Sequence, residues 1–340
     1  SLIGVYVVAY VWWFFANGII IDRVSVLWSF AIFLTVASVG RPWREWVRSA
    51  GDLSLFVAMW LAYDESRGIA DGLGMPIQVE SVRDLDRFLF FGADPVVELQ
   101  AAFHRTEVAE RIVNGEAVLR TVTDVQWYDV VGSFVYYSHF IVPPIVIGAL
   151  WLINRHQWVR YMRRFATLLF GACVMFILLP TAPPWMAAGG TNRVGLDLEA
   201  LPPLSRHTGV GWRYVGLGSF VQAWDTGRDW ANQVAAMPSL HSAFALFVVV
   251  FFWPWVRNPW ARVAMLAYPL AMAVALAYFA EHYIVDAIAG WLLVGASFWL
   301  WNRIEVWLAT RSVPIDDVML GDDEADKTRD SLVSADATTA

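Results

Sequence analysis

Two histidine motifs in the C-terminal half contain residue types that could do chemistry together. His282 and Asp286 lie in the segment EHYIVD (281–286), at the entry to an apolar stretch. The i, i+4 spacing predicts both side chains on one helical face, where the carboxylate can accept the Nδ1–H of the ring. That bond fixes the tautomer and leaves Nε2 free to attack an electrophile. Taken alone, the same pair is equally typical of a structural ion pair.

His241 lies in the segment MPSLHS (237–242), where a polar loop gives way to another apolar stretch. Ser239 is a suitable N-cap, and Pro238 marks the break, so His241 is expected in the first helical turn. Free N–H groups and the positive end of the helix dipole make this position a candidate anion site. A lone histidine beside an N-cap is otherwise an ordinary surface residue.

The other four histidines are distinguished by position. His104 and His207 fall in polar loops and are expected to be solvated, and His156 falls in a basic loop. His139 lies inside an apolar stretch, where ionisable groups usually face a polar cavity. Either a groove-lining role or a hydrogen-bonded packing role fits His139.

The composition around these motifs is that of a membrane protein. Hydrophobic residues make up 58% of the 340 residues and charged residues 16%, and the mean hydropathy is +0.49. These values exclude a soluble enzyme, a nucleic-acid-binding protein and a disordered chain. Residues 316–340 hold eight acidic side chains against two basic ones, so −6 of the net charge of −7 belongs to the tail. Cys173 is the only cysteine, which excludes an intrachain disulfide and cysteine-based catalysis.

Eight apolar stretches are long enough to cross a bilayer as helices. To within a few residues they are 2–21, 24–39, 53–69, 127–154, 165–179, 239–256, 262–280 and 284–301. The first has no basic leader or cleavage site, so we expect a helix rather than a signal peptide. The predicted fold is an all-α polytopic membrane helix bundle. Residues 1–52 would form two N-terminal spans, 53–310 a six-span catalytic core with outer loops 70–126 and 181–238, and 311–340 an acidic, disordered tail.

Arginine clusters predict the orientation of the chain in the cell membrane. They follow every second apolar stretch, at 41–48, 155–164, 257–262 and 303–311. The positive-inside rule makes that face cytoplasmic, together with both termini. One helical hairpin separates His241 from His282, so both are expected at the extracytoplasmic face. Two imidazoles at one site suit phosphoryl transfer, one as nucleophile and one as acid.

The first outer loop is expected to contain two short surface helices. Ser81 with Asp84 is typical of a capping box, and a second helix could begin at Asp94-Pro95. These helices would either cover the ends of the spans or gate a lipid substrate.

The two histidine motifs together resemble the second and third signatures of the type 2 phosphatidic acid phosphatase superfamily. The PSLH and EHYxxD forms, with PTAPPW at 180–185, look most like the inositol phosphorylceramide synthase and sphingomyelin synthase branch, including its bacterial relatives. The resemblance covers roughly 125–305. It implies a membrane enzyme that acts on lipid phosphates through a phosphohistidine, with no metal or cofactor. It makes His282 the nucleophile, Asp286 its orienting partner and His241 the acid.

The sequence departs from the phosphatase branch of this superfamily. Ala275 and Leu276 stand where that branch has Ser-Arg, so its phosphate-clamping arginine is absent, and the first signature is absent too. An anionic phosphoryl group still needs positive charge or N–H donors. The candidate substrate-binding residues are therefore Ser239, Arg193, Arg206, Arg213 and Arg228.

The departures favour transfer of a phosphoryl or phospho-headgroup from a membrane lipid phosphate to an alcohol, such as inositol, another polyol or a glycan lipid. The alternative is a lipid or polyprenyl phosphate phosphatase, in which water is the acceptor. A phospholipid transporter predicts charges distributed along the spans, whereas here they cluster at one face. A purely structural protein would not require the paired histidine motifs. Ceramide, diacylglycerol and polyprenyl tails all remain compatible with the sequence.

Overall fold

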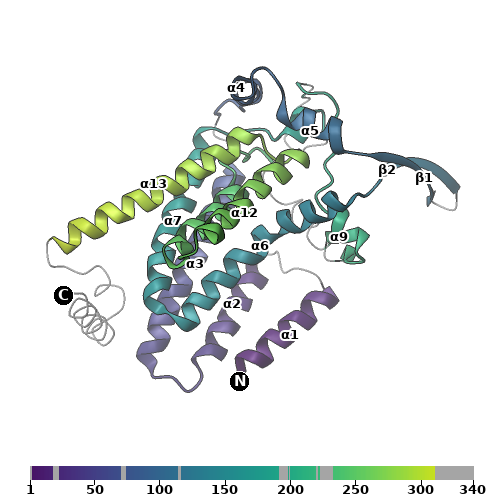
Figure 1. Cartoon of the computed structure of the whole chain (residues 1–340). Coiled ribbons are helices and arrows are strands. Elements are labelled where there is room, and N and C mark those ends of the chain that lie inside the picture. Colours follow the sequence, from purple (N-terminus) through teal and green to yellow (C-terminus); the bar gives the residue numbers. More distant parts are fainter. Residues whose placement is uncertain are drawn as a thin grey trace.

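The computed structural model describes residues 2–17, 23–69, 74–113, 116–190, 198, 200–219, 221–222 and 233–310. Long helices run side by side through this part of the chain (Figure 1). They fall on the predicted apolar stretches: α1 Leu2–Asn17, α2 Arg23–Ser38, α3 Trp43–Ile69, α6 Trp127–Ile153, α7 Arg155–Leu178, α11 Leu240–Phe252, α12 Pro259–Tyr278 and α13 Ile284–Ala309. The predicted all-α membrane bundle is confirmed. The acidic tail at 311–340 lies outside the described residues.

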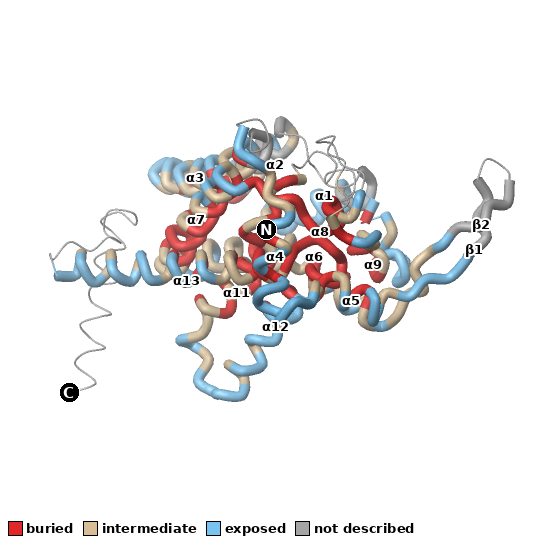
Figure 2. Tube along the Cα trace, turned by 90° about the horizontal axis from the view of Figure 1, so that it is seen from above, coloured by how far each residue is buried: buried red, intermediate tan, exposed pale blue. Residues whose placement is uncertain are grey.

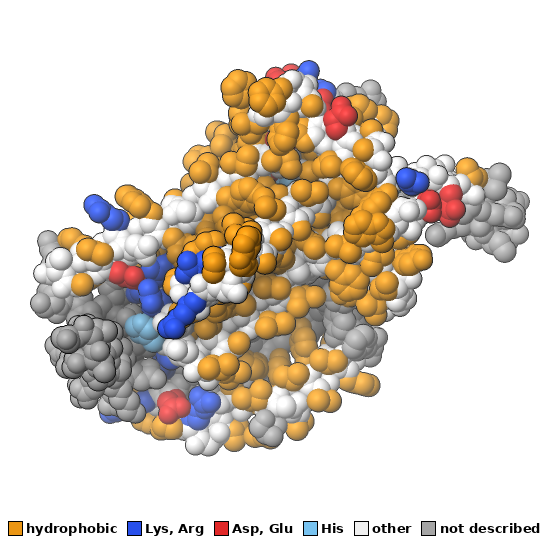
Figure 3. Space-filling model, in the orientation of Figure 1, with side chains coloured by type: hydrophobic (Ala, Val, Ile, Leu, Met, Phe, Trp, Pro, Cys, Tyr) orange, Lys and Arg blue, Asp and Glu red, His pale blue; other side chains and the backbone are white. Residues whose placement is uncertain are grey.

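The surface of the bundle is apolar where a bilayer would surround it. Within the described ranges, four helices are long and apolar enough to cross a membrane: α6, α7, α12 and α13. Shorter apolar segments lie at Leu2–Trp13 and Leu240–Trp255. Hydrophobic side chains cover the middle of the face in Figure 3, and charged side chains gather toward its ends. A water-soluble surface rarely shows such a continuous apolar area.

Helix α7 begins ten residues before the predicted stretch at 165–179, so part of the expected basic loop is helical. Arg163 and Arg164 are buried on α7, and both form ion pairs with Glu305 of α13. Arg155, the first residue of α7, pairs with Asp52 of α3. Charges that the sequence places in a basic loop are instead paired between helices, because buried charges need partners.

One of the hydrophobic core clusters lies between α7 and α11. Tyr161 and Phe165 of α7 pack their rings against Phe247 of α11 at centroid distances of 4.9 and 5.6 Å. Buried stretches, red in Figure 2, lie at the centre of the bundle around these two helices. Edge-to-face aromatic packing of this kind fixes α11, whose first turn carries His241.

Short elements lie at the end of the bundle where α13 begins. They are α4 Glu80–Leu89, α5 Pro95–Phe103, β1 Thr106–Val113, β2 Glu116–Thr123, α8 Pro184–Ala187 and α9 Val210–Tyr214, with the 3-10 turn η1 Trp253–Trp255 at the other end of α11. Strands β1 and β2 form an antiparallel hairpin that projects from the bundle and that the sequence analysis did not predict (Figure 1).

The predicted start of the second surface helix is confirmed, because Asp94 is the N-cap residue of α5 and Pro95 its first residue. The predicted capping box at Ser81 is wrong. Helix α4 begins at Glu80, so Ser81 is already helical, and its hydroxyl donates to the side chain of Gln78 instead.

Candidate functional site

His282 and Asp286 form a buried pair at the start of α13. Nδ1 of His282 lies 3.3 Å from Oδ2 of Asp286, and the two residues are 7% and 0% exposed. His282 precedes the helix instead of lying on its face as predicted: Tyr283 is the N-cap, and its N–H donates to the same Asp286 oxygen at 3.0 Å. The Asp286 carboxylate therefore points back toward the start of the helix, where it contacts the His282 ring.

A tight turn between α12 and α13 places His282. Ala280 has a left-handed backbone with φ of 58°, and the N–H groups of Glu281 and His282 both donate to the carbonyl of Leu276, at 2.9 and 3.3 Å. This arrangement caps the C-terminal end of α12. A left-handed alanine is unfavourable by about 1–2 kcal/mol, and the packing of the fully buried Ala280 stabilises it.

Helices α11 and α13 meet closely beside the pair. The backbone N–H of Ser239 donates to the Asp286 carbonyl at 2.9 Å, and Ser239 caps α11 by accepting from Ser242. The N-cap predicted from the sequence is thus confirmed. Gly290 allows the contact, since a Cβ there would lie 2.5 Å from the Ser239 carbonyl oxygen. The rings of His241 and His282 are 5.5 Å apart, so the structure brings the two motifs together.

His139 joins the histidines from α6. Its ring centroid lies 4.1 Å from that of His241 and 5.0 Å from that of Phe244, and it is half-buried. Tyr136 of the same helix also stacks on His241, at 5.0 Å. The structure shows His139 in ring contact with the site histidine His241, a contact that was not predicted.

Arg206 is the described candidate arginine that contacts the residue next to the pair. Its guanidinium donates to both oxygens of Glu281, at 2.6 and 2.9 Å, directly next to His282 in the chain. The same guanidinium lies over the ring of Trp185 at 4.2 Å. The backbone N–H of Trp185 donates to the carbonyl of Ala280. The PTAPPW segment therefore forms a wall of the site through Trp185.

Gln100 of α5 holds the segment that carries Arg206, which the sequence did not indicate. Its amide donates to the carbonyls of Ser205 and Tyr278, at 2.7 and 2.8 Å, and accepts from the Ser205 N–H at 2.8 Å. This three-bond clamp fixes the residue before Arg206 to the end of α12.

The structure describes one of the other three candidate arginines. Arg213 is exposed on α9. Arg193 and Arg228 lie outside the described residues.

His207 corrects the expectation of a solvated side chain. It is 7% exposed, its Nδ1 lies 3.1 Å from the Ser205 carbonyl oxygen, and its Nε2 lies 3.7 Å from Asp129 of α6. The ring of half-buried His104 lies 4.4 Å away. The loop folds back on α6, so its imidazole packs among aromatic rings instead of facing water.

Asp86 of α4 is the site residue that sequence reasoning missed most clearly. It is 1% exposed, and its two carboxylate oxygens accept the N–H groups of Ile284 and Val285, at 3.1 and 2.7 Å. The N-terminus of α13 is thus occupied by a carboxylate of the protein itself.

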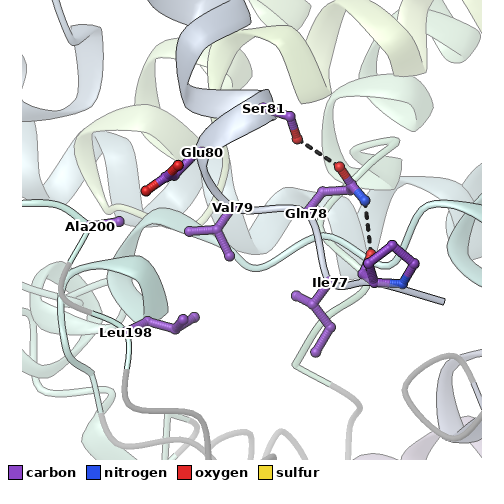
Figure 4. A pocket seen from close by; sticks show the side chains of 8 residues that line it. Ile77, Gln78, Val79, Glu80, Ser81, Leu198 and Ala200 are labelled. Carbon is purple, nitrogen blue, oxygen red and sulfur yellow. Dashed lines mark hydrogen bonds between the residues drawn. The ribbon is translucent and has the colours of Figure 1, made fainter. Parts of the chain in front are cut away.

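A cavity of about 700 Å³ lies beside the start of α4 and does not contain the histidines. Figure 4 shows its lining, with Gln78 and Ser81 joined by a hydrogen bond on one side and Leu198 and Ala200 on the other. Its lining carries no histidine and no arginine, so the histidine cluster remains the candidate site. Among the residues that the structure describes, no group of three or more His, Cys, Asp or Glu is placed to hold a metal ion.

A sequence model of the PAP2 superfamily matches residues 101–300. The chain belongs to the PAP2 superfamily. The matched range contains His139, Arg206, His241 and the His282–Asp286 pair, whereas Asp86 precedes it. No curated protein and no solved structure matches the chain. As a PAP2 protein with long apolar helices, it is a membrane enzyme with an activity of the lipid phosphatase or phosphotransferase type.

Proposed function

We propose that this protein transfers a phosphoryl or phospho-headgroup from a lipid phosphate to an alcohol acceptor such as inositol, through a phosphohistidine at the extracytoplasmic face of the cell membrane. The observation that carries the proposal is the buried His282–Asp286 pair, with the His241 ring 5.5 Å from that of His282. A carboxylate on Nδ1 leaves Nε2 of His282 as the attacking atom. The second imidazole supplies the proton that a leaving alkoxide needs.

The proposed reaction has two half-reactions. In the first, Nε2 of His282 attacks phosphorus, a P–N bond forms, the P–O bond to the lipid breaks, and the leaving oxygen takes a proton from His241. Asp286 stabilises the positive charge on the imidazole ring. In the second, His241 takes the proton of the acceptor hydroxyl, whose oxygen attacks phosphorus and releases His282.

Arg206 is the proposed source of positive charge for the phosphate. It lies beside His282 and pairs with Glu281. A bidentate guanidinium suits a phosphoryl group as well as a carboxylate, so an arriving phosphate can replace Glu281 as its partner. The stacking on Trp185 limits the conformations that the side chain has to lose.

The preference for an alcohol acceptor rests on the motifs of the synthase-like branch. Ala275 and Leu276, at the positions of the phosphatase Ser-Arg, are 5% and 0% exposed and pack within the apolar core. The exposed apolar side chains of α4, Leu85, Phe88 and Leu89, lie at the same end of the bundle as the site and suit a lipid substrate.

Mass spectrometry of a deletion strain identifies the lipid phosphate that accumulates without the protein. That lipid is then the substrate with which the acceptor is tested. Purified protein given that lipid and inositol in the presence of EDTA is expected to form a phosphoinositol product, since the proposed mechanism needs no metal. If only inorganic phosphate forms while inositol is present, the protein is a phosphatase and the proposed transferase activity is wrong. Activity that is abolished by EDTA and restored by one divalent ion would contradict the phosphohistidine mechanism.

The proposed orientation can be tested with single cysteines in a Cys173→Ser background. Tyr214→Cys on α9 should react with a membrane-impermeant maleimide in intact cells, because the arginine clusters put this end outside. Pro42→Cys, in the connection between α2 and α3, is the matched control and should react only after lysis. The reverse pattern would place the histidines on the cytoplasmic face.

A further inference from the structure

Three successive backbone N–H groups at the start of α13 are shared between two carboxylates. The N–H of Tyr283 donates to Asp286, and those of Ile284 and Val285 donate to Asp86. The first N–H groups of a helix have no partner within the helix, so carboxylates stabilise them. Here one carboxylate belongs to α13 and contacts His282, while the other comes from a helix about 200 residues earlier in the chain.

Asp86 is committed to this contact. Arg83, one turn before it on α4, pairs instead with Asp94 and donates to the Ala200 carbonyl. Within the described part of the chain, the hydrogen-bond partners of the Asp86 carboxylate are the two N–H groups of α13. Its neighbour Val82 is buried too, so the inner face of α4 is fixed against this end of the bundle.

We propose that the ionised Asp86 carboxylate is a positioning residue for the reaction: it holds the first turn of α13, and thereby holds Asp286 against Nδ1 of His282. This inference rests on the proposed function of the His282–Asp286 pair. When Asp86 loses its charge, it accepts the Ile284 and Val285 N–H groups less strongly, and these groups become alternative donors for Asp286. A carboxylate drawn toward them orients the His282 ring less well. Asp86 touches no reacting atom, so the effect falls on turnover and not on lipid binding.

The surroundings of Asp86 set the pH at which this happens. Burial raises the pKa of its carboxyl from the ordinary 3.8 to about 6; the two N–H groups lower it, and the charges of Asp286 and Asp94 raise it further. Tyr283 on α13 also interacts with Asp86, whereas Arg83 on its own helix interacts with Asp94 and Tyr283. Since a carboxylic acid accepts N–H bonds less well than a carboxylate, the cap weakens as the pH falls through about 6.

Acid unfolding caused by protonation of Asp86 does not explain a loss of activity as the pH falls through about 6. A carboxyl with a raised pKa binds more protons in the folded state than in the unfolded state between pH 3.8 and about 6. Its contribution to the free energy of unfolding therefore grows as the pH falls across this window. If activity is lost in this pH window while the protein stays folded, the loss is therefore due to the positioning role of Asp86.

The test compares wild type with Asp86→Asn, whose amide imitates the protonated acid at every pH. The measured quantity is the wild-type kcat divided by the variant kcat, because titration of the site histidines cancels in this ratio. We expect about a tenfold ratio at pH 7.5, the effect of one lost charge-assisted hydrogen bond. The ratio should fall toward one below pH 5, with a midpoint near 6 and an unchanged KM. Asp84→Asn, an exposed carboxylate on the same helix, is the matched control and should give a ratio near one throughout.

A ratio for Asp86→Asn that does not change with pH overturns the positioning role. Failure of the proposed function is distinguished by His282→Ala: if this variant stays active, the phosphohistidine proposal fails. Hydrogen exchange of the Ile284 and Val285 amides in the wild-type protein tests their hydrogen bonds to Asp86 independently of any activity measurement. Their protection, corrected for intrinsic exchange, should drop between pH 7.5 and 5, and constant protection contradicts the inference even if the Asn variant does not fold.

Discussion

The His282→Ala protein is expected to lose at least about three orders of magnitude in turnover, because the proposed covalent step has no other nucleophile. The loss should fall on kcat, since the lipid still binds through its tail and its phosphate. The readout is product formation from the accumulated lipid at saturating concentration, with the amount of folded protein measured in the membrane fraction.

His156→Ala is the matched control, because this half-buried histidine lies in the first turn of α7, in the predicted basic region. It should retain wild-type turnover. Activity above about a tenth of wild type in His282→Ala would remove this residue as the nucleophile. His241→Ala and Asp286→Ala should also abolish turnover, because catalytic groups that act as one unit fail together.

Gly290→Ala is expected to lower turnover by about a hundredfold, although it adds one methyl group. The new Cβ would lie 2.5 Å from the Ser239 carbonyl oxygen and 3.2 Å from the Cβ of Ala243. Both neighbours belong to the rigid start of α11, so the helices have to separate. Separation moves His241 away from His282 and weakens the hydrogen bond from Ser239 to the Asp286 carbonyl.

Gly295→Ala provides the control on the same helix. A Cβ there meets nothing within 4 Å, so only the helix propensity changes, which slightly favours alanine. Its turnover should equal that of wild type. Equal activities for the two alanine variants would show that the α11–α13 contact does not set the geometry of the histidines.

Local signals in the sequence determined the helices and some of their ends. A bilayer offers no hydrogen-bond partners, so apolar runs of about 20 residues have to become helices whatever surrounds them. That is why all eight predicted stretches correspond to helices in the described chain. Ser239 caps its helix as predicted, and α5 begins after Asp94 as predicted, because helix starts depend on residues one to three positions away.

Where local sequence patterns gave a wrong prediction, contacts with residues distant in the chain determined the structure. Helix α7 extends back to Arg155 because Asp52 and Glu305, from two other helices, neutralise its arginines. His207 is buried because its loop folds onto α6. Neither partner can be read from the neighbouring residues.

The sequence by itself determined the membrane bundle and, through one intervening hairpin, that His241 and His282 share an end of it. Only the tertiary structure decided how the site is held. Its contacts join residues far apart in the chain: Arg206 reaches Glu281 across 75 positions and Asp86 reaches Val285 across 199. No periodicity or spacing encodes such pairs, because each forms only after the helices have packed and have left a polar group without a local partner.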